Sequence, residues 1–373
     1  MNKLGFVKGT VVTMRILHTS DLHFGIKLCG VPLMENQRFF IEQIEDIICD
    51  YGIDAVAVAG DVFDSSVANS EAITAYNDFA VKICGKLGIK MIVIAGNHDS
   101  AARLGMTSAL LENSGLYVTA YLDEMKKISI DNADIYCIPY FNASQIENAG
   151  SYENAYMIIC DEIRRKADKS RVNILMAHAF VNGSRISESD KAAAVGGSNL
   201  VSKDVFGGFD YVALGHLHRF QEIGENIVYS GSPVKYSFGE AEQDKQVVIF
   251  DTNTKKREYV KIGQKHDLCV VKGTYDEVVC GENNDDYVKV VLTDRNAGLT
   301  VTDELRSRYK NLLSVVGKSG DEHETAVTSE EISHMSPTDI LNMYFKEKFD
   351  YEPTKEQIKL FEKAVSDVWE EKR

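Results

Sequence analysis

Short apolar runs alternate with longer amphipathic segments along the first two thirds of the chain. The runs at 15–20, 55–59 and 91–95 are rich in apolar residues, as expected of strands that are buried in a sheet. Apolar residues three or four positions apart predict helices at 32–51, 70–87 and 104–113. Strands and helices that alternate at this spacing predict right-handed crossovers and an α/β fold with a parallel-rich sheet covered on both faces.

The pattern continues to favour strands as far as Ile262, around one predicted helix at 152–167. The additional strands are expected at 126–131, 134–138, 172–178, 210–214, 227–229 and 246–250. The remaining residues differ, because strand-like segments become sparse and a polar stretch intervenes. Expected there are strands at 268–272 and 287–292, a helix at 303–316, a polar stretch from Gly317 to Ser336, and closing helices at 337–348 and 353–371.

These changes of pattern predict four segments. We expect a loose extension at 1–13, a large α/β domain at 14–262, a smaller domain at 263–336 and a helical segment at 337–373. A chain of 373 residues is longer than one core usually holds, which agrees with this division. Met14 stands immediately before the first strand, so either Met1 or Met14 can be the natural start.

Composition narrows the class of protein. The chain is 44% hydrophobic and 26% charged, which is typical of globular proteins. It has no apolar run of 18 residues and no secretory leader pattern. Its seven cysteines are scattered without a CxxC. We therefore expect a cytoplasmic protein with reduced thiols and no membrane partner.

The net charge is −15, with 26 basic against 33 acidic residues at 1–262 and 15 against 23 at 263–373. This balance argues against a simple basic clamp for nucleic acid.

Residues that can bind metal follow five of the predicted strands. They are Asp21, His23, Asp61, Asp64, Asn97, His98, His178, His216 and His218. In an open α/β sheet, ligands bind at the carboxyl ends of the strands. Each short motif alone is more often a turn or a helix cap, but all of them in this order predict a metal site.

The mixture of donors indicates the kind of metal. Imidazole, carboxylate and amide oxygen together suit Mn²⁺, Fe or Zn²⁺. A carboxylate can bridge two cations, and Asp61 is the natural bridge. Two ions about 4 Å apart can generate a hydroxide at neutral pH and bind a phosphoryl group for in-line attack.

The motifs resemble those of the calcineurin-like metallophosphoesterase superfamily. Matching segments are Asp21-x-His23, Gly60-Asp61-x-x-Asp64, Gly96-Asn97-His98-Asp99, His178 and Gly215-His216-x-His218. The later segments Tyr229-Ser230-Gly231-Ser232-Pro233 and Ser237-Phe238-Gly239-Glu240 are similar to its SbcD branch of nuclease subunits. The resemblance is strong over about 14–262 and weak beyond. It implies a four-layer α-β-β-α sandwich with a smaller α+β C-terminal capping domain.

The resemblance also implies roles for individual residues. One ion would be held by Asp21, His23, Asp61 and His218, and the other by Asp61, Asn97, His178 and His216. His98 would face the scissile phosphate, stabilising its charge or protonating the leaving oxygen, and Asp64 would orient His98. Asp99 is expected either to support the ligands or to cap a helix, and His18 is expected to be structural.

The function implied by the resemblance is that of a manganese-dependent nuclease subunit, with Mg²⁺, Fe or Zn²⁺ as other possible ions. It would act as an ATP-dependent double-strand 3′–5′ exonuclease and a single-strand and hairpin endonuclease in DNA repair, replication and recombination. Its partners would be DNA and an SbcC-like coiled-coil ATPase, within a heterotetramer located at the nucleoid. Helices 70–87 and 104–113 are the expected homodimer contacts.

Several alternatives stay open. A phosphoesterase acting on a small nucleotide or phosphodiester, or a non-catalytic assembly subunit, would share the metal motifs. The two C-terminal helices can either bury their apolar faces against each other or bind a partner. The basic residues near the motifs can contact DNA phosphates or simply be solvated; they are Arg103, Arg185, Lys203, Arg219 and Lys235. Gly317-Lys318-Ser319 lacks the first glycine of a phosphate-binding loop and is rejected as a nucleotide site.

Overall fold

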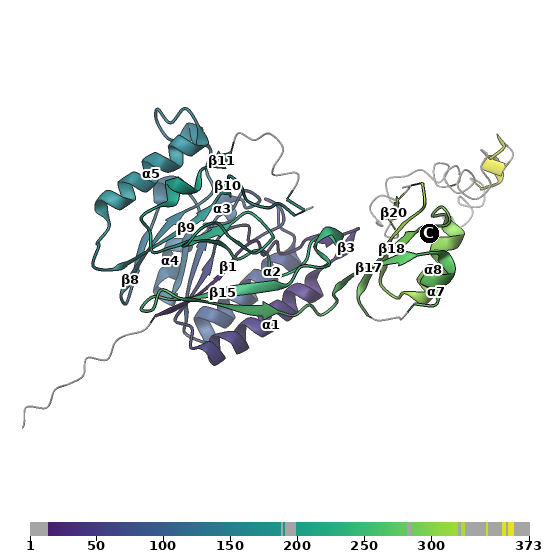
Figure 1. Cartoon of the computed structure of the whole chain (residues 1–373), viewed down its shortest axis with the longest axis horizontal. Helices are drawn as coiled ribbons and strands as arrows, with labels where there is room; N and C mark the ends of the chain where they lie inside the picture. Colours follow the sequence, from purple (N-terminus) through teal and green to yellow (C-terminus); the bar gives the residue numbers. More distant parts are fainter. Residues whose placement is uncertain are drawn as a thin grey trace, which may run out of the picture. The chain divides into compact units, whose positions relative to one another are not determined.

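The computed structural model consists of two compact units (Figure 1). The larger unit holds the chain up to Ile26 and Leu33–Lys265, and the smaller holds Lys27–Pro32 and the residues from His266 on. The structure describes residues 14–187, 189–190, 199–281, 285–319, 322–324, 341, 353–355 and 357–361. No helix within these ranges is long and apolar enough to span a membrane.

The first sheet of the larger unit has six strands in the order β16-β15-β1-β4-β5-β6. These are β16 (Arg257–Ile262), β15 (Lys245–Asp251), β1 (Arg15–Thr19), β4 (Ala55–Val58), β5 (Lys90–Ile94) and β6 (Leu116–Thr119). The four strands from β1 to β6 run parallel, and β15 and β16 add an antiparallel edge. Strands β6 and β16 were not predicted from the sequence.

The second sheet also has six strands, in the order β13-β14-β12-β9-β8-β7. These are β13 (Gln221–Glu222), β14 (Ile227–Tyr229), β12 (Tyr211–Gly215), β9 (Val172–His178), β8 (Ala133–Ile138) and β7 (Lys127–Ile130). The four central strands are parallel, and β13 and β7 pair antiparallel at the edges. Outside these sheets, β10 (Phe180–Val181) pairs with β11 (Leu200–Val201) in the larger unit. Strand β2 (Lys27–Leu28) pairs with β3 (Val31–Pro32) in the segment that belongs to the smaller unit.

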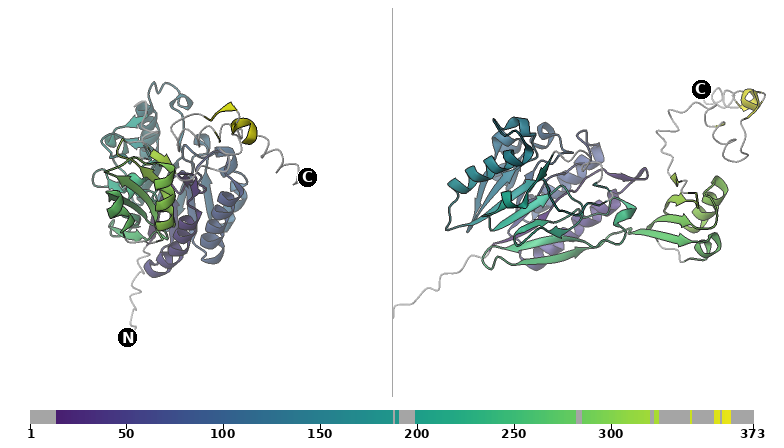
Figure 2. Two further views of the ribbon diagram at one scale, coloured as in Figure 1. Left: turned by 90° about the vertical axis from the view of Figure 1, so that its right-hand side faces the viewer. Right: turned by 45° about the horizontal axis from the view of Figure 1, so that its top comes forward.

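Helices α1 (Met34–Tyr51) and α2 (Ser70–Ala80) cover the first sheet, and α5 (Tyr152–Lys166) covers the second (Figures 1 and 2). Local sequence sets their ends. The Asn69 side chain caps α2 by accepting from the Ala72 N–H, and Gly52 ends α1 in a left-handed conformation with φ of 60°. Helix α2 continues into a π-helical segment, Val81–Lys86.

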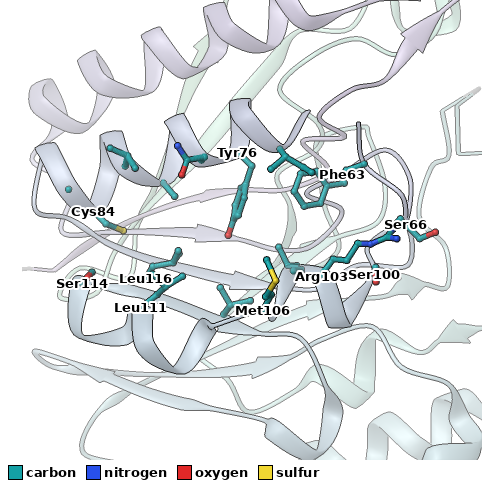
Figure 3. A pocket seen from close by; sticks show the side chains of 18 residues that line it. Phe63, Ser66, Tyr76, Cys84, Ser100, Arg103, Met106, Leu111, Ser114 and Leu116 are labelled. Atoms are coloured by element: carbon teal, nitrogen blue, oxygen red, sulfur yellow. The ribbon is translucent and has the colours of Figure 1, made fainter. Parts of the chain in front are cut away.

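The prediction of one continuous helix at 104–113 is wrong. The structure has two single turns instead, α3 (Ala101–Leu104) and α4 (Ser108–Leu111), followed by a 3-10 turn at Glu112–Ser114. Thr107 has a φ of 59°, which a continuous right-handed helix does not allow. Between α2 and these turns lies an apolar cavity of 720 Å³, lined by Tyr76, Met106 and Leu111 among others (Figure 3).

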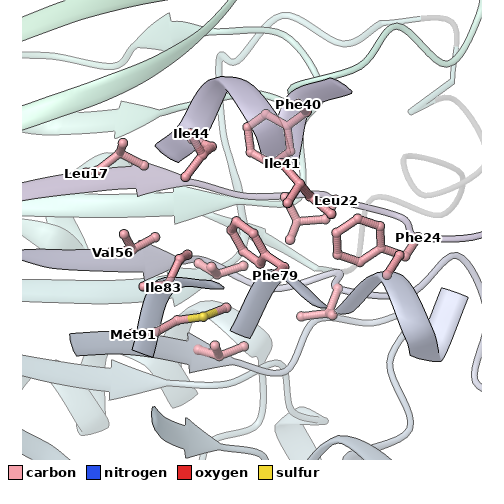
Figure 4. Packing of buried hydrophobic residues seen from close by; sticks show 14 of the residues in the cluster. Leu17, Leu22, Phe24, Phe40, Ile41, Ile44, Val56, Phe79, Ile83 and Met91 are labelled. Atoms are coloured by element: carbon pink, nitrogen blue, oxygen red, sulfur yellow. The ribbon is translucent and has the colours of Figure 1, made fainter. Parts of the chain in front are cut away.

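Three apolar cores hold the larger unit together. One joins α1 and α2 to the first sheet, with Phe40, Ile44 and Phe79 packed on Leu17 and Met91 (Figure 4). A second fills the space between the two sheets, and a third joins α5 to the second sheet. Each fully buried aliphatic or aromatic side chain contributes about 1.5–3 kcal/mol. The order helix, sheet, sheet, helix confirms the predicted α/β sandwich of four layers.

The smaller unit is an α+β domain with its own core. Its sheet has the order β17-β18-β19-β20, with α7 (Tyr275–Val279) and α8 (Leu299–Arg308) packed on it. The strands are β17 (Leu268–Gly273), β18 (Tyr287–Leu292), β19 (Leu312–Val316) and β20 (Glu322–Glu324). The helix predicted at 303–316 is therefore wrong in its second half, because 312–316 is an apolar stretch that pairs with β18.

Four predicted segments lie wholly or mostly outside the described residues. These are the extension at 1–13, the polar stretch from Gly317 to Ser336 and the closing helices at 337–348 and 353–371. The predicted boundary after 262 falls three residues before the division between the two units. The domain division at 263–336 and 337–373 stays a prediction.

Candidate metal centre

The predicted ligands come together where the two sheets meet at one edge. Asp21, Asp61 and Asn97 follow β1, β4 and β5 of the first sheet. The three histidines come from the second sheet, since His178 ends β9 and His216 and His218 follow β12. Ligand atoms of Asp21, His23 and His218 lie within 4.8 Å of one another, and so do those of Asp21, Asp61 and His178. Their placement agrees with a two-ion site.

Four of these residues have a left-handed backbone, which is uncommon outside glycine. They are Asp21 (φ 53°), His23 (φ 40°), Asp61 (φ 50°) and His216 (φ 103°). Such conformations cost about 1–3 kcal/mol each and persist where the surrounding structure enforces them. Here the Asp21 N–H donates to the Gly60 carbonyl and the His23 N–H donates to the Asp61 carbonyl, both at 3.0 Å. Four of the nine non-glycine residues with positive φ in the described part of the chain therefore belong to the candidate site.

The Asp61 carboxylate lies between the two groups of ligands. Its Oδ2 is 3.3 Å from Nε2 of His178 and 3.7 Å from Nε2 of His23. Its Oδ1 accepts a hydrogen bond from the His98 backbone N–H at 2.9 Å. A carboxylate with partners on both sides fits the bridging position that the sequence predicted for it.

On one side of Asp61, a nitrogen of each of two histidines faces the amide oxygen of Asn97. Nδ1 of His178 donates to the Ala59 carbonyl at 2.9 Å, so Nε2 is the atom that faces Asn97 Oδ1 at 3.0 Å. Nδ1 of His216 is 2.9 Å from the same oxygen. Metal-bound histidines usually donate their other N–H to a carbonyl or carboxylate in this way, which fixes the ligating nitrogen. The arrangement fits a divalent cation.

On the other side, His23 and His218 bring their Nε2 atoms to 3.1 Å from each other. Nδ1 of His218 is held by the Ser189 hydroxyl at 2.8 Å, while the buried Nδ1 of His23 has no hydrogen-bond partner. Two buried imidazoles in contact, one with an unsatisfied nitrogen, are costly unless a cation lies between them. The donor set fits an ion here as well.

Charge and burial act in opposite directions in this site. Burial lowers the pKa of His23 to about 4 and that of His216 to about 3, so both rings are neutral at physiological pH. Burial also opposes the charged form of His178, but the carboxylates of Asp61 and Asp21 outweigh it and raise its pKa to about 9. A cation bound at Nε2 would take the place of this proton, so metal binding at His178 would release a proton.

His98 and Asp64 meet in a way that the sequence did not indicate. The atom of Asp64 that contacts His98 is its main-chain oxygen, which accepts from Nδ1 of His98 at 2.8 Å. The Asp64 carboxylate lies 3.8 Å from Nδ1 of His23, and ligand atoms of His23, Asp64 and His98 lie within 4.8 Å of one another. His98 is exposed, so its remaining nitrogen, Nε2, is available to a substrate. These residues line a cavity of 180 Å³ together with His23, Asp61, His218 and Tyr236.

Two glycines of the motifs serve close packing rather than turning. A Cβ on Gly96 would lie 2.1 Å from Oδ1 of Asp61, and one on Gly215 would lie 1.9 Å from the Ala59 carbonyl oxygen. Neither glycine has a positive φ. They are required because ligand loops touch at these points, two loops of the first sheet at Gly96 and one loop from each sheet at Gly215.

Residues that the sequence analysis left without a definite role hold the ligand loops in place. The Asp99 carboxylate accepts from the backbone N–H groups of Val62, Phe63 and Gly96, so it ties two loops together and does not cap a helix. Tyr236 donates to the carbonyls beside β1, at Asp21 and Leu22. Buried Gln37 does the same for Leu22 and His23. These side chains could not be singled out from the sequence, because their partners are distant along the chain.

Two further residues of the sequence analysis have structural roles. His18 is fully buried between the sheets, with Nδ1 2.8 Å from the Tyr211 hydroxyl and Nε2 3.1 Å from the Leu214 carbonyl. This confirms the structural role expected for it. Lys235, a candidate for DNA contact, is only 6% exposed and donates to the Ala241 carbonyl. It is therefore no longer a candidate for phosphate binding.

Comparison with known proteins identifies the family. The model of the calcineurin-like phosphoesterase family matches residues 14–220. The chain belongs to the calcineurin-like phosphoesterase family. A second family model, described as a type 5 capsule protein repressor C-terminal domain, matches residues 264–349. The match to the phosphoesterase family covers every predicted ligand, and the chain is a metal-dependent phosphoesterase.

Relatives of this phosphoesterase include two curated proteins that are named as the SbcD component of the nuclease SbcCD. That of Staphylococcus epidermidis is 28% identical, over 90% of this chain and 94% of the relative. That of Staphylococcus saprophyticus is 27% identical, over 96% and 99%. These two relatives confirm the resemblance to the SbcD branch. Among solved structures, a dimetal phosphatase from Danio rerio covers 67% of this chain and 99% of its own, with 8% identity and a TM-score of 0.40.

Proposed function

We propose that this phosphoesterase is the nuclease subunit of an SbcCD-like complex and hydrolyses phosphodiesters of DNA. The activities proposed are ATP-dependent double-strand 3′–5′ exonuclease and single-strand and hairpin endonuclease, in DNA repair, replication and recombination. The observation that carries the proposal is the pair of ligand groups joined by Asp61, in a chain similar to nuclease subunits over most of its length.

The proposed ligands divide between two ions. Asp21, His23, Asp61 and His218 would hold one, and Asp61, Asn97, His178 and His216 the other. The ions, proposed to be Mn²⁺, would supply a hydroxide at neutral pH and offset the charge of the phosphoryl group. Burial keeps the rings of His23 and His216 neutral, and hydrogen bonds to Ala59 and Ser189 fix the ligating nitrogens of His178 and His218.

His98 is proposed to act on the substrate and not on the metals. Its Nδ1 donates to the main-chain oxygen of Asp64, which sets the ring orientation and leaves Nε2 to face a phosphate or a leaving oxygen. Its backbone N–H is bonded to Asp61, so the ring is placed relative to the proposed bridging ligand. Asp64 is proposed as a positioning residue for both His98 and His23.

The test compares the wild type with a His98→Ala variant on Mn²⁺ and labelled single-stranded, hairpin and duplex DNA. We expect the wild type to cut DNA, and the variant to lose activity by about 10²–10⁴-fold while still binding two ions, because His98 lies outside the proposed ligand set. Cleavage of small phosphodiesters without cleavage of DNA would favour the nucleotide phosphoesterase alternative. Unchanged turnover in the variant would refute the catalytic role of His98.

The proposed partners are an SbcC-like ATPase and a second copy of this chain. ATP dependence is assigned to the partner, which would bind the C-terminal helical segment at 337–373. The dimer is assigned to α2 and the α3–α4 turns, because apolar side chains are exposed on both sides of the 720 Å³ cavity (Figure 3). Ile73 is 52% exposed, Met106 69% and Leu110 75%. A second copy that buries them would complete a heterotetramer acting at the nucleoid in the cytoplasm.

A further inference from the structure

A buried network of polar side chains lies directly behind His218. Nδ1 of His218 is 2.8 Å from the Ser189 hydroxyl, and that hydroxyl donates to Oε1 of Glu240 at 2.6 Å. Since the hydroxyl proton is given to Glu240, the oxygen of Ser189 accepts the proton of His218 Nδ1. The chain of hydrogen bonds therefore fixes His218 as the tautomer whose Nε2 faces His23 and the proposed ion.

The network ends in an ion pair that has almost no contact with solvent. Oε2 of Glu240 is 2.6 Å from Nζ of Lys245, with the two residues 0% and 4% exposed. Nζ of Lys245 also donates to the main-chain oxygen of His218 and to the Ser232 hydroxyl, both at 2.9 Å. Lys245 thus holds the backbone of His218, and Glu240 holds its ring through Ser189.

An ion pair at this depth needs a reason other than stability. Taking two charges out of water costs free energy that their mutual attraction does not reliably repay, and apolar replacements of such pairs are often neutral or stabilising. Both members of this pair act on His218 instead, Lys245 by a direct hydrogen bond to its main-chain oxygen and Glu240 through the Ser189 hydroxyl. Partners of this kind behind a metal-bound histidine fix its ring and raise its basicity as a ligand.

We propose that Ser189, Glu240 and Lys245 form a positioning relay that sets the metal affinity of the ion bound through His218. The proposal rests on the proposed metal site. Asp190 adds to the relay, because its Oδ1 accepts from the His218 backbone N–H at 3.2 Å and lies 3.3 Å from Nδ1. Ser189 is the informative position, since its hydroxyl contacts both the ring of His218 and the carboxylate of the ion pair.

The chain offers a matched control for this test. Ser237 also donates to Oε1 of Glu240, at 3.2 Å, as Ser189 does, but its hydroxyl bonds to the glutamate and not to His218. Removing either hydroxyl takes one donor from the same carboxylate oxygen. Only the removal of Ser189 takes away the acceptor of the histidine ring.

The experiment is a Mn²⁺ titration of the full chain, followed by the electron paramagnetic resonance signal of free Mn²⁺. We expect Ser189→Ala to lower the affinity for one of the two Mn²⁺ ions by about 10–100-fold. This is the usual effect of removing the hydrogen-bond partner of a metal-bound histidine. Ser237→Ala should bind both ions like the wild type, and Ser189→Thr, which keeps the hydroxyl, should restore most of the affinity. The double variant Glu240→Gln/Lys245→Met, which removes both charges together, should weaken the same ion as Ser189→Ala.

The outcomes separate this inference from the proposed function. If Ser189→Ala binds Mn²⁺ as tightly as Ser237→Ala, the relay is refuted while the nuclease proposal stands. If the wild type binds two ions, the variants behave as expected and no DNA is cut, the relay stands and the nuclease proposal fails. A wild type that binds no Mn²⁺ would refute both.

Discussion

At the scale of single residues, burial decides which titratable groups can carry charge. His18 shows this most clearly, because it lies outside the proposed ligands and is fully buried between the sheets. Burial lowers its pKa from 6.5 to about 3, against a smaller opposing effect of its hydrogen bond to the Leu214 carbonyl. The ring is therefore neutral in the folded protein and becomes charged on unfolding at mildly acidic pH.

This difference predicts how stability depends on pH. The unfolded chain binds a proton at His18 below about pH 6.5 and the folded chain does not until about pH 3, so stability falls as pH falls through this window. A His18→Gln variant keeps hydrogen-bonding groups but does not titrate. We expect its free energy of unfolding to fall less steeply with acid, by up to about 1.4 kcal/mol per pH unit.

The measurement is urea unfolding of both proteins between about pH 4.5 and about pH 7.5, a range that spans the ordinary pKa of histidine. A chelator is present so that release of metal ions does not contribute to the pH dependence. The difference in slope between the two curves isolates His18, since the other titrating groups are shared. Parallel curves for wild type and variant would contradict the assignment.

At the scale of elements, the exposed apolar side chains of α2 and the α3–α4 turns set this surface apart. Helix α5 covers the other sheet and exposes Met157 to 42%, whereas Leu110 on α4 is 75% exposed. Its neighbour Leu111 lines the 720 Å³ cavity together with Met106. Exposed apolar patches of this kind mark interaction sites. The broken geometry of 101–114 is what opens the cavity beside α2.

The dimer proposal predicts the effect of a charge at this surface. Leu110→Asp should convert the chain to a monomer in sedimentation velocity, because a carboxylate would be buried unpaired between the two copies. Its free energy of unfolding in the monomeric state should change by less than about 0.5 kcal/mol, since the side chain is exposed. Met157→Asp is the control and should leave the oligomeric state unchanged. A dimeric Leu110→Asp would place the interface elsewhere.

At the scale of the whole molecule, the net charge of −15 limits how the chain can bind nucleic acid. Asp21 and Asp61 are part of that charge and would be neutralised by the bound ions, whose charge dominates the site. More than half of the excess lies at 263–373, the region that contains the proposed partner-binding segment. DNA binding by the isolated chain should therefore be weak and should depend on the metals.

This expectation can be measured with the His98→Ala variant, which is expected not to cut its ligand. Fluorescence anisotropy with labelled duplex DNA should show binding with Mn²⁺ and little with chelator. The logarithm of the affinity should fall with salt less steeply than for proteins that make about 6–10 phosphate contacts. Tight binding in chelator would contradict the metal-dependent model.

The sequence alone was sufficient to predict the five strands that lead into the proposed ligands, which are β1, β4, β5, β9 and β12. Buried strands are recognisable as local apolar runs, and Asp21, Asp61 and His178 stand at or near their ends. Parallel pairing brings Asp21 and Asp61 to one edge of the first sheet, and His178 and His216 to one edge of the second. The family resemblance then supplied the four-layer architecture. These inferences worked because each depends on a short stretch of chain.

Only the tertiary structure decided the features that depend on distant partners. Residues 312–316 form a strand because they pair with β18, although the local pattern favoured a helix. Gly96 and Gly215 are required because loops that are distant in the sequence touch there, and the main-chain oxygen of Asp64 accepts a hydrogen bond from His98. The relay from His218 through Ser189 to Glu240 joins residues up to 51 positions apart. Local sequence encodes which side chains can do chemistry, whereas long-range packing determines which atoms meet.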